Sequence, residues 1–275
     1  EEQVGPNDTV AGSFLPDLDR ARFAAHFDWL VPTHYDPVHD KLITSNHSWL
    51  IRQDQLTILL DTCAGNHKER PWLPRFHQLN VPFLERLEAA GAKPQDIDIV
   101  LCTHLHADHV GWNTRLENGR WVPNFPKARY LFSKDEYAHW EREHAKAPSP
   151  VFADSVLPVV EAGRVDFVAN DYQMNDLVKL ESTPGHTPDH VAVRLGKKGA
   201  DALATGDLIH SPLQARYPEI SMRADVDPVQ AAATRRRVLE CACDTSTILC
   251  FGHFPSPSRG RIKRWGEGFR AEAVD

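Results

Sequence analysis

Four side chains of metal-binding types crowd into six residues in the first half of the chain. They follow the apolar run 97–102, in the segment Thr-His-Leu-His-Ala-Asp-His. If that run is a strand, His104 and His106 project to the same side, and Asp108 and His109 lie on the following turn. Neutral imidazole and carboxylate suit zinc and similar divalent ions. One ion cannot easily take all four ligands from so short a loop, so the spacing indicates two ions.

Two ions need more ligands than one loop supplies, and three later positions carry the same residue types. Each position stands beside a glycine just after an apolar run. At such a glycine the backbone can come close to a bound ligand or to another part of the chain. Alone, each would be explained as a packed histidine or a capping aspartate. Their shared place at predicted strand ends makes them candidate ligands: His186 after 177–181, Asp207 after 202–205 and His253 after 247–251.

The elements that must position these residues alternate between strand and helix patterns, which predicts an α/β or α+β fold. Apolar or β-branched runs predict strands, and apolar residues at helical spacing predict helices. We expect a single domain over residues 1–275, with a polar N-terminal arm at 1–40 and a cap segment at 113–176. The predicted strands are 48–52, 57–60, 97–102, 128–132, 177–181, 191–195, 202–205 and 247–251, and the predicted helices are 81–90, 134–144 and 229–242.

Composition disfavours several classes of protein. The chain has 275 residues, 41% of them hydrophobic, and a net charge of −7. The densest basic cluster, at 235–237, is short and is expected on a solvated helix face, so nucleic-acid binding is disfavoured. No apolar stretch approaches the roughly 18 residues that a membrane span needs. The expected partner is therefore a small molecule rather than a nucleic acid or a membrane.

Cysteine usage bears on the compartment. Five cysteines show no framework spacing, so a reducing compartment is favoured and we expect a cytoplasmic location. The first residues do not resemble a signal peptide. The sequence starts without Met, so earlier removal of a segment stays open.

The histidine motif, joined by the later Gly-His-Thr-Pro and Gly-Asp, resembles the metallo-β-lactamase-fold hydrolase superfamily. The matching positions run from Asp61 to His253 and cover most of the chain. This resemblance implies a four-layer αββα sandwich with two metals at one edge of its two sheets. It implies that Asp61 orients the ligand loop from behind the metals, as outer residues generally must. It also implies the ligand sets: His104, His106 and His186 on one metal, Asp108, His109 and His253 on the other, and Asp207 bridging both.

Several positions narrow the branch of the superfamily. Asp207 stands where the best-known β-lactamases carry Cys, so penicillin hydrolysis is disfavoured. His106 stands where flavodiiron relatives carry Glu, so redox iron chemistry is disfavoured. The segment 101–112, together with Gly-Asp-Leu-Ile, is most similar to methyl parathion hydrolases and acyl-homoserine-lactone lactonases. Those lactonases usually carry a Tyr three residues after the bridging Asp, where this chain has His210, and Asp189 replaces a usual Gly.

The residues and the resemblance together predict a metal-dependent hydrolase of the lactonase or esterase type. A hydroxide bridging two divalent ions would open a small neutral ester or lactone, because metal binding lowers the pKa of water from 15.7 to roughly 7. Zinc is the first expectation, with manganese, iron or cobalt as alternatives. We assign catalytic roles to Asp207, Asp108 and His210, the last as a proton donor. Trp112 and Phe254, which flank ligands in the sequence, are expected to line the pocket.

Other assignments stay open at this point. An organophosphate triester hydrolase would use the same metals with a different pocket. A glyoxalase II-like thioesterase is disfavoured because the chain after His253 is short for the helical domain which that family adds. A non-catalytic binding protein is disfavoured because the ligand set is complete. His210 could instead be a packed histidine, and a homodimer is implied by the resemblance alone.

Overall fold

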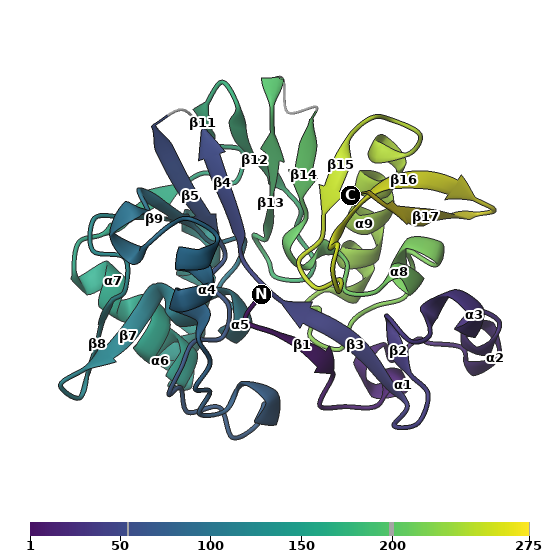
Figure 1. Ribbon diagram of the computed structural model, residues 1–275, viewed down its shortest axis with the longest axis horizontal. Helices are drawn as coiled ribbons and strands as arrows, with labels where there is room; N and C mark the ends of the chain where they lie inside the picture. Colours follow the sequence, from purple (N-terminus) through teal and green to yellow (C-terminus); the bar gives the residue numbers. More distant parts are fainter. Residues whose placement is uncertain (54, 198–200, 275) are drawn as a thin grey trace. The chain divides into compact units, whose positions relative to one another are not determined.

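The computed structural model describes residues 1–53, 55–197 and 201–274 (Figure 1). The chain falls into two compact units. The first unit comprises Glu1–Gln3 and Asn46–Ala169, and the second comprises Val4–Ser45 and Asn170–Asp275. Both units combine helices with strands, which confirms the predicted α/β (α+β) class.

A five-stranded sheet forms the first unit, in the order β10-β9-β6-β5-β4. β4 and β5 form an antiparallel hairpin, whereas β5, β6, β9 and β10 run parallel. The carboxyl ends of parallel strands meet at one edge of a sheet. Asp61 follows β5 and the histidine motif follows β6, so both lie at that edge. The strands are β4 (Trp49–Gln53), β5 (Leu56–Leu60), β6 (Ile99–Leu101), β9 (Arg129–Ser133) and β10 (Val165–Val168).

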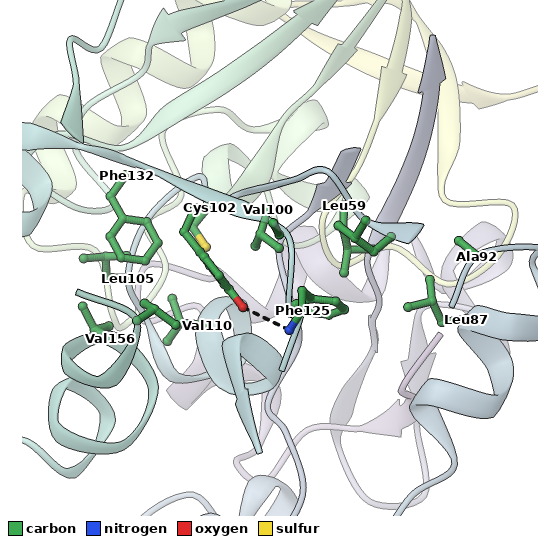
Figure 2. Close-up of a cluster of buried hydrophobic side chains, with 14 of the residues drawn as sticks. Leu59, Leu87, Ala92, Val100, Cys102, Leu105, Val110, Phe125, Phe132 and Val156 are labelled. Atoms are coloured by element: carbon green, nitrogen blue, oxygen red, sulfur yellow. Dashed lines mark hydrogen bonds between the residues drawn. The ribbon is translucent and has the colours of Figure 1, made fainter. Parts of the chain in front are cut away.

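Packing beneath this edge anchors the histidine motif. Leu105, which separates two of its histidines, belongs to a buried apolar cluster with Val100, Val110 and Phe132 (Figure 2). Since its neighbours in sequence are polar, this burial fixes the motif against the core of the first unit.

The helices of the first unit are η1 (Pro74–Phe76), α4 (Phe83–Ala89), η2 (Pro94–Asp96), α5 (Ala107–Val110), η3 (Gly111–Asn113), α6 (Lys134–Lys146), η4 (Phe152–Val156) and α7 (Leu157–Glu161). Two further strands, β7 (Thr114–Glu117) and β8 (Arg120–Pro123), form a hairpin.

A seven-stranded sheet forms the second unit, in the order β11-β12-β13-β14-β15-β16-β17. β12 and β14 are both antiparallel to β13, and β14 is parallel to β15, so β12, β14 and β15 point the same way. His186, Asp207 and His253 follow these three strands and therefore lie at one edge. The strands are β11 (Gln173–Asn175), β12 (Val178–Ser182), β13 (Val191–Leu195), β14 (Ala202–Ala204), β15 (Ile248–Cys250), β16 (Arg259–Trp265) and β17 (Gly268–Ala273).

Helix α9 (Pro228–Ala242) packs on the second sheet (Figure 1) and buries Val238 and Leu239 in a cluster with Leu203 and Leu249. It begins where the Asp227 side chain accepts a hydrogen bond from the Gln230 N–H at 2.9 Å, an N-cap that satisfies an end of the helix. The other helices of this unit are α1 (Ala11–Phe14), α2 (Arg20–Ala24), α3 (Phe27–Leu30), η6 (Gly206–Leu208) and α8 (Pro212–Arg216). A small sheet in the order β1-β3-β2 contains β1 (Gln3–Pro6), β2 (Tyr35–Asp36) and β3 (Lys41–Asn46). Its residues Gln3 and Asn46 are counted with the first unit.

Two segments singled out by the sequence contain regular structure. The predicted arm at 1–40 holds β1, β2 and three short helices, and the predicted cap at 113–176 supplies β9 and β10 to the first sheet. The division into a single domain with an arm and a cap stays a prediction. Within the described parts of the chain, no helix is long and apolar enough to cross a membrane.

Candidate metal centre

The first unit carries one half of the predicted site, which we call the first half-site (Asp61, His104, His106, Asp108 and His109). The ring centres of His104 and His109 lie 4.1 Å apart, and those of His104 and His106 lie 4.6 Å apart. Asp108 Oδ1 lies 3.9 Å from His109 Nε2. The structure therefore gathers the four motif residues that the sequence singled out.

Asp61 is hydrogen-bonded to His109 directly and to His104 through the Thr103 hydroxyl. Its carboxylate accepts hydrogen bonds from the Thr103 N–H at 2.8 Å and from His109 Nδ1 at 2.9 Å. The Thr103 hydroxyl donates to Asp61 at 2.9 Å and lies 3.0 Å from His104 Nδ1, so the hydroxyl accepts from that ring. Both rings thus carry their proton on Nδ1 and present Nε2 as the donor atom for a metal. The sequence resemblance assigned this orienting role to Asp61.

Two loops hold Asp61 and His109 at this separation. The Thr62 N–H donates to the His109 carbonyl at 2.7 Å, and the Gly111 N–H donates to the Cys63 carbonyl at 2.7 Å. A Cβ on Gly111 would lie 1.9 Å from the Ala64 carbonyl oxygen, so only glycine permits this approach.

Helix α6 contributes a brace that sequence reasoning missed. The Glu136 carboxylate is buried and accepts from Trp140 Nε1 at 2.7 Å and from the Leu105 N–H at 3.3 Å. The Trp140 ring packs edge-on against His106, with ring centres 5.3 Å apart. The sequence predicted a polar helix here and gave no sign that Glu136 turns inward.

The second unit carries the other half of the predicted site, which we call the second half-site (His186, Asp207, His210 and His253). Asp207 is 3% exposed, and the Nε2 atoms of three histidines surround its carboxylate. His186 Nε2 lies 3.1 Å from Oδ2, His210 Nε2 lies 3.0 Å from Oδ2, and His253 Nε2 lies 2.9 Å from Oδ1. Asp207, His210 and His253 form a group that could hold a metal ion within this unit alone.

Each outer nitrogen of the predicted ligands in this half-site has an oxygen acceptor. His253 Nδ1 donates to the Ser45 carbonyl at 3.0 Å, and His186 Nδ1 donates to Asp225 Oδ1 at 2.8 Å. The Asp207 N–H donates to His190 Nε2 at 2.9 Å, which fixes the start of η6. Ser45, Asp225 and His190 hold these candidate ligands in place, as partners behind metal ligands commonly do.

Electrostatics favour positive charge at the centre of this half-site. Burial lowers the pKa of His186, but the Asp207 and Asp225 carboxylates outweigh burial and raise that pKa to about 9. Although burial disfavours the charged form of Asp225, His186 holds the pKa of that carboxyl below its usual range. The two carboxylates therefore stabilise a positive charge at His186 Nε2, whether that charge is a proton or a metal ion. Buried histidine nitrogens with carboxylates are donors that fit a divalent ion such as zinc.

Arg235 corrects one prediction. The cluster at 235–237 was expected on a solvated helix face, yet Arg235 is 0% exposed, whereas Arg236 and Arg237 are exposed. Its guanidinium donates to the carbonyls of Leu208, Pro218 and Ile220 at 2.7–2.8 Å and lies 3.6 Å from Asp225 Oδ2. The helical period turns Arg235 inward, where it supports the segment after Asp207.

The two aromatic residues expected in the pocket are both buried. Trp112 stacks on Phe83 with ring centres 5.1 Å apart, and Phe254 stacks on Phe251 at 4.0 Å. Both contacts are packing contacts within one unit. A role for Trp112 and Phe254 as pocket walls stays a prediction.

Comparison with known proteins identifies the family. The sequence matches the metallo-beta-lactamase superfamily over residues 44–253, so the chain belongs to that superfamily. The N-acyl homoserine lactonase AiiB of Agrobacterium fabrum is 28% identical over 269 residues, covering 87% of this chain and 92% of AiiB. An N-acyl homoserine lactonase of Bacillus cereus is 26% identical over 175 residues, covering 63% of this chain. The chain spans 62% of the length of that Bacillus relative.

Solved structures establish the fold. The hydrolase AbOPH of the beta lactamase superfamily matches with a TM-score of 0.82 at 22% identity, covering 100% of this chain and 92% of that one. AidC, described as a dizinc quorum-quenching lactonase in complex with a product, matches with a TM-score of 0.82 at 21% identity and the same coverage. The predicted metallo-β-lactamase fold is therefore confirmed.

Proposed function

We propose that this protein is a metal-dependent hydrolase that opens small neutral lactones or esters, with N-acyl homoserine lactones as the first substrate class. The observation that carries the proposal is the buried Asp207 carboxylate with three histidine Nε2 atoms within 3.1 Å. Two comparisons support the proposal. The sequence relatives are named N-acyl homoserine lactonases, and the structural neighbour AidC is described as a dizinc lactonase.

The proposed ligand sets follow the superfamily. His104, His106 and His186 would hold one divalent ion, Asp108, His109 and His253 the other, and Asp207 would bridge them. The braced Nδ1 atoms of His104, His109, His186 and His253 support this assignment, because each brace leaves Nε2 facing inward in its own unit. Zinc is the proposed metal, with manganese, iron and cobalt as alternatives. The bound ions would supply Lewis acidity and a hydroxide nucleophile near neutral pH.

Side chains of the protein would carry the proton from the attacking water to the leaving oxygen. Asp207 offers two differently engaged oxygens, Oδ1 against His253 and Oδ2 against His186 and His210. It would take the proton released as water attacks the substrate carbonyl. Burial lowers the pKa of His210 despite the Asp207 charge, so its ring is neutral at neutral pH with a proton on Nε2. We propose that His210 gives its Nε2 proton to the leaving oxygen and is then reprotonated at Nε2 by Asp207, which holds the proton taken from water, while Asp108 orients the neighbouring ligands.

The organisation of the chain is part of the proposal. The family match includes residues of both units, which supports a single metallo-β-lactamase domain over 1–275, with an arm at 1–40 and a cap at 113–176. Trp112 and Phe254 would line its substrate pocket. A homodimer and the cytoplasmic location expected from the cysteines also remain proposals.

A substrate panel tests the function. Protein loaded with zinc is given an N-acyl homoserine lactone, an aryl ester, an organophosphate triester, a glutathione thioester and a cephalosporin at equal concentrations. We expect kcat/KM to be highest for the lactone or the aryl ester. A triester or thioester as the best substrate would move the protein to that class of hydrolase, and the cephalosporin as the best substrate would contradict the assignment. If zinc binds and no substrate turns over, a non-catalytic binding protein is the better description.

A further inference from the structure

A carboxylate from the start of the chain is buried in the first unit beside the first half-site. Glu2 is 1% exposed, and all of its hydrogen-bond donors belong to the same unit. Its Oε1 accepts from the Gly65 N–H at 3.0 Å and from Trp112 Nε1 at 2.7 Å. Its Oε2 accepts from the Ala64 N–H at 3.0 Å and from Asn46 Nδ2 at 2.7 Å. Four N–H donors on two oxygens suit an ionised carboxylate, which only accepts.

The backbone shapes this set of donors, which we call the Glu2 cradle (Asn46, Ala64, Gly65 and Trp112). Cys63 and Gly65 both have left-handed backbones, with φ of 49° and 78°. The successive N–H groups of Ala64 and Gly65 then point at one carboxylate, as in the concave backbone sites that bind anions. Burial raises the pKa of Glu2 above its ordinary value of 4.5, and the four donors act against burial. The four donors are therefore the groups that favour the charged form of this buried carboxylate.

The cradle spans the two loops that set the separation of Asp61 from His109. Ala64 and Gly65 belong to the loop after Asp61, and Trp112 belongs to η3, the short helix that makes up the loop after His109. These loops also bond directly, since the Trp112 N–H donates to the Thr62 carbonyl at 2.8 Å. Glu2 is the side chain that adds charge-assisted hydrogen bonds to both loops at once, and such bonds are shorter and stronger than neutral ones.

The backbone that carries Glu2 is itself fixed. The Glu2 N–H donates to the Asn46 carbonyl at 2.8 Å, and Arg86 Nη1 donates to the Glu2 carbonyl at 2.6 Å. Gln3 Nε2 donates to the Arg75 carbonyl at 3.1 Å. The carboxylate is therefore delivered by an ordered segment and not by a loose end.

We propose that Glu2 is a positioning residue of the metal centre, which clamps the loop 61–65 to the loop 109–113 and so holds Asp61 against His109. This role rests on the proposed metal centre. Removing partners that orient metal ligands typically weakens metal affinity 10–100-fold. Because Glu2 acts on Asp61 through two loops, we expect the loss to lie near the tenfold end.

Chemical rescue separates this role from general stability. Full-length Glu2→Ala protein should bind zinc about tenfold more weakly than the wild type in competition with a chromogenic chelator. Its cobalt-loaded form should show an altered visible absorption spectrum, because the His109 geometry is loosened. Added formate or acetate should restore both readings, since a small carboxylate can enter the vacated cradle. Added carboxylate should not restore zinc affinity in Glu2→Gln, because the glutamine side chain still fills the cradle. Its amide NH2 group would also face N–H donors, with which it cannot form a hydrogen bond.

Matched variants complete the test. Glu85→Gln removes an exposed glutamate from α4 in the same unit and should bind zinc as the wild type does. Asn46→Ala and Trp112→Phe each remove one donor from the cradle, and each should show a smaller loss of zinc affinity. These two variants decide the question if circular dichroism shows that Glu2→Ala does not fold. Wild-type zinc affinity and an unchanged cobalt spectrum in the cradle variants, or a loss that no carboxylate restores, would overturn the clamp. A wild-type chain that binds no metal would instead overturn the proposed function itself.

Discussion

His210 Nε2 lies 3.0 Å from Asp207 Oδ2, the same carboxylate oxygen that His186 Nε2 approaches at 3.1 Å. The other oxygen, Oδ1, lies 2.9 Å from His253 Nε2. Three imidazoles thus share one buried carboxylate, two on Oδ2 and one on Oδ1. The superfamily ligand pattern accounts for His186 and His253. His210 is the additional group, and its contact with Asp207 makes a role in proton transfer testable.

His210→Ala is expected to keep both metals and to lower kcat. A positioned acid–base group typically contributes roughly 10²–10⁴-fold to the rate, so the effect should exceed assay error. Metal content and kcat must be measured on the same sample. His39→Ala, which removes an exposed histidine of the second unit, is the matched control. Unchanged kcat with both metals bound would make His210 a packed histidine, and lost metal would place it in the coordination shell.

Asp207→Ala is expected to lose metal and activity together. The wild type should carry two equivalents of divalent metal by elemental analysis after mild dialysis, because the proposed ligands form two sets. Asp207 serves both sets, and without its charge three buried histidines would face one another. Retained activity with two equivalents bound would show that another residue bridges the ions, and a wild-type value of one or less would contradict a dinuclear centre.

Asp225→Asn is expected to weaken zinc binding by about tenfold, because it weakens the acceptor that fixes His186 Nδ1 at 2.8 Å. The amide keeps the size of the side chain, so the fold should remain. Asp227→Asn lies two residues away on the exposed N-cap of α9 and should leave zinc affinity unchanged, since Asn caps helices as well as Asp does. Chelator competition on both variants makes the comparison. Equal affinities would show that Asp225 does not support the ligand.

The candidate ligands could be located in the sequence because they follow apolar strands that are themselves easy to predict. His104 to His109 follow β6, and Asp207 follows β14, as the strand patterns indicated. The second sheet was incompletely predicted for a physical reason. β16 carries mostly charged side chains and buries only Gly260 and Ile262, and β17 interrupts its apolar residues with Arg270 and Glu272, so no apolar run marks either strand.

Apart from Asp61, which the resemblance supplied, the residues behind the candidate ligands could not be predicted, because their partners are distant in sequence. His253 is bonded to Ser45, 208 positions earlier, and His186 is bonded to Asp225, 39 positions later. Arg235 was assigned to the solvent from its charge alone, although only one residue of that basic run turns inward. Such contacts depend on the tertiary fold, and no local spacing in the sequence encodes them.

A buried lysine of the first unit provides the last prediction. Lys68 is 0% exposed, and its Nζ donates to the Thr114 hydroxyl at 2.6 Å and to the Asp154 carbonyl at 3.0 Å. It also lies 3.5 Å from the centre of the Trp121 ring. Burial lowers the pKa of Lys68 from 10.5 to about 7, and the Asp154 charge only partly opposes this.

The free energy of unfolding should therefore rise with pH relative to Lys68→Met. Between about pH 7 and 10.5 the unfolded chain binds the lysine proton and the folded chain does not, so the folded state gains stability as pH increases. One proton gives a slope of at most about 1.4 kcal/mol per pH unit. Urea unfolding of wild type and Lys68→Met across this range, under reducing conditions, measures the difference. Lys179→Met, at an exposed strand position, should show no such slope. A pH-independent difference between wild type and Lys68→Met would mean that Lys68 stays protonated in the fold, held by Asp154 and the Trp121 ring.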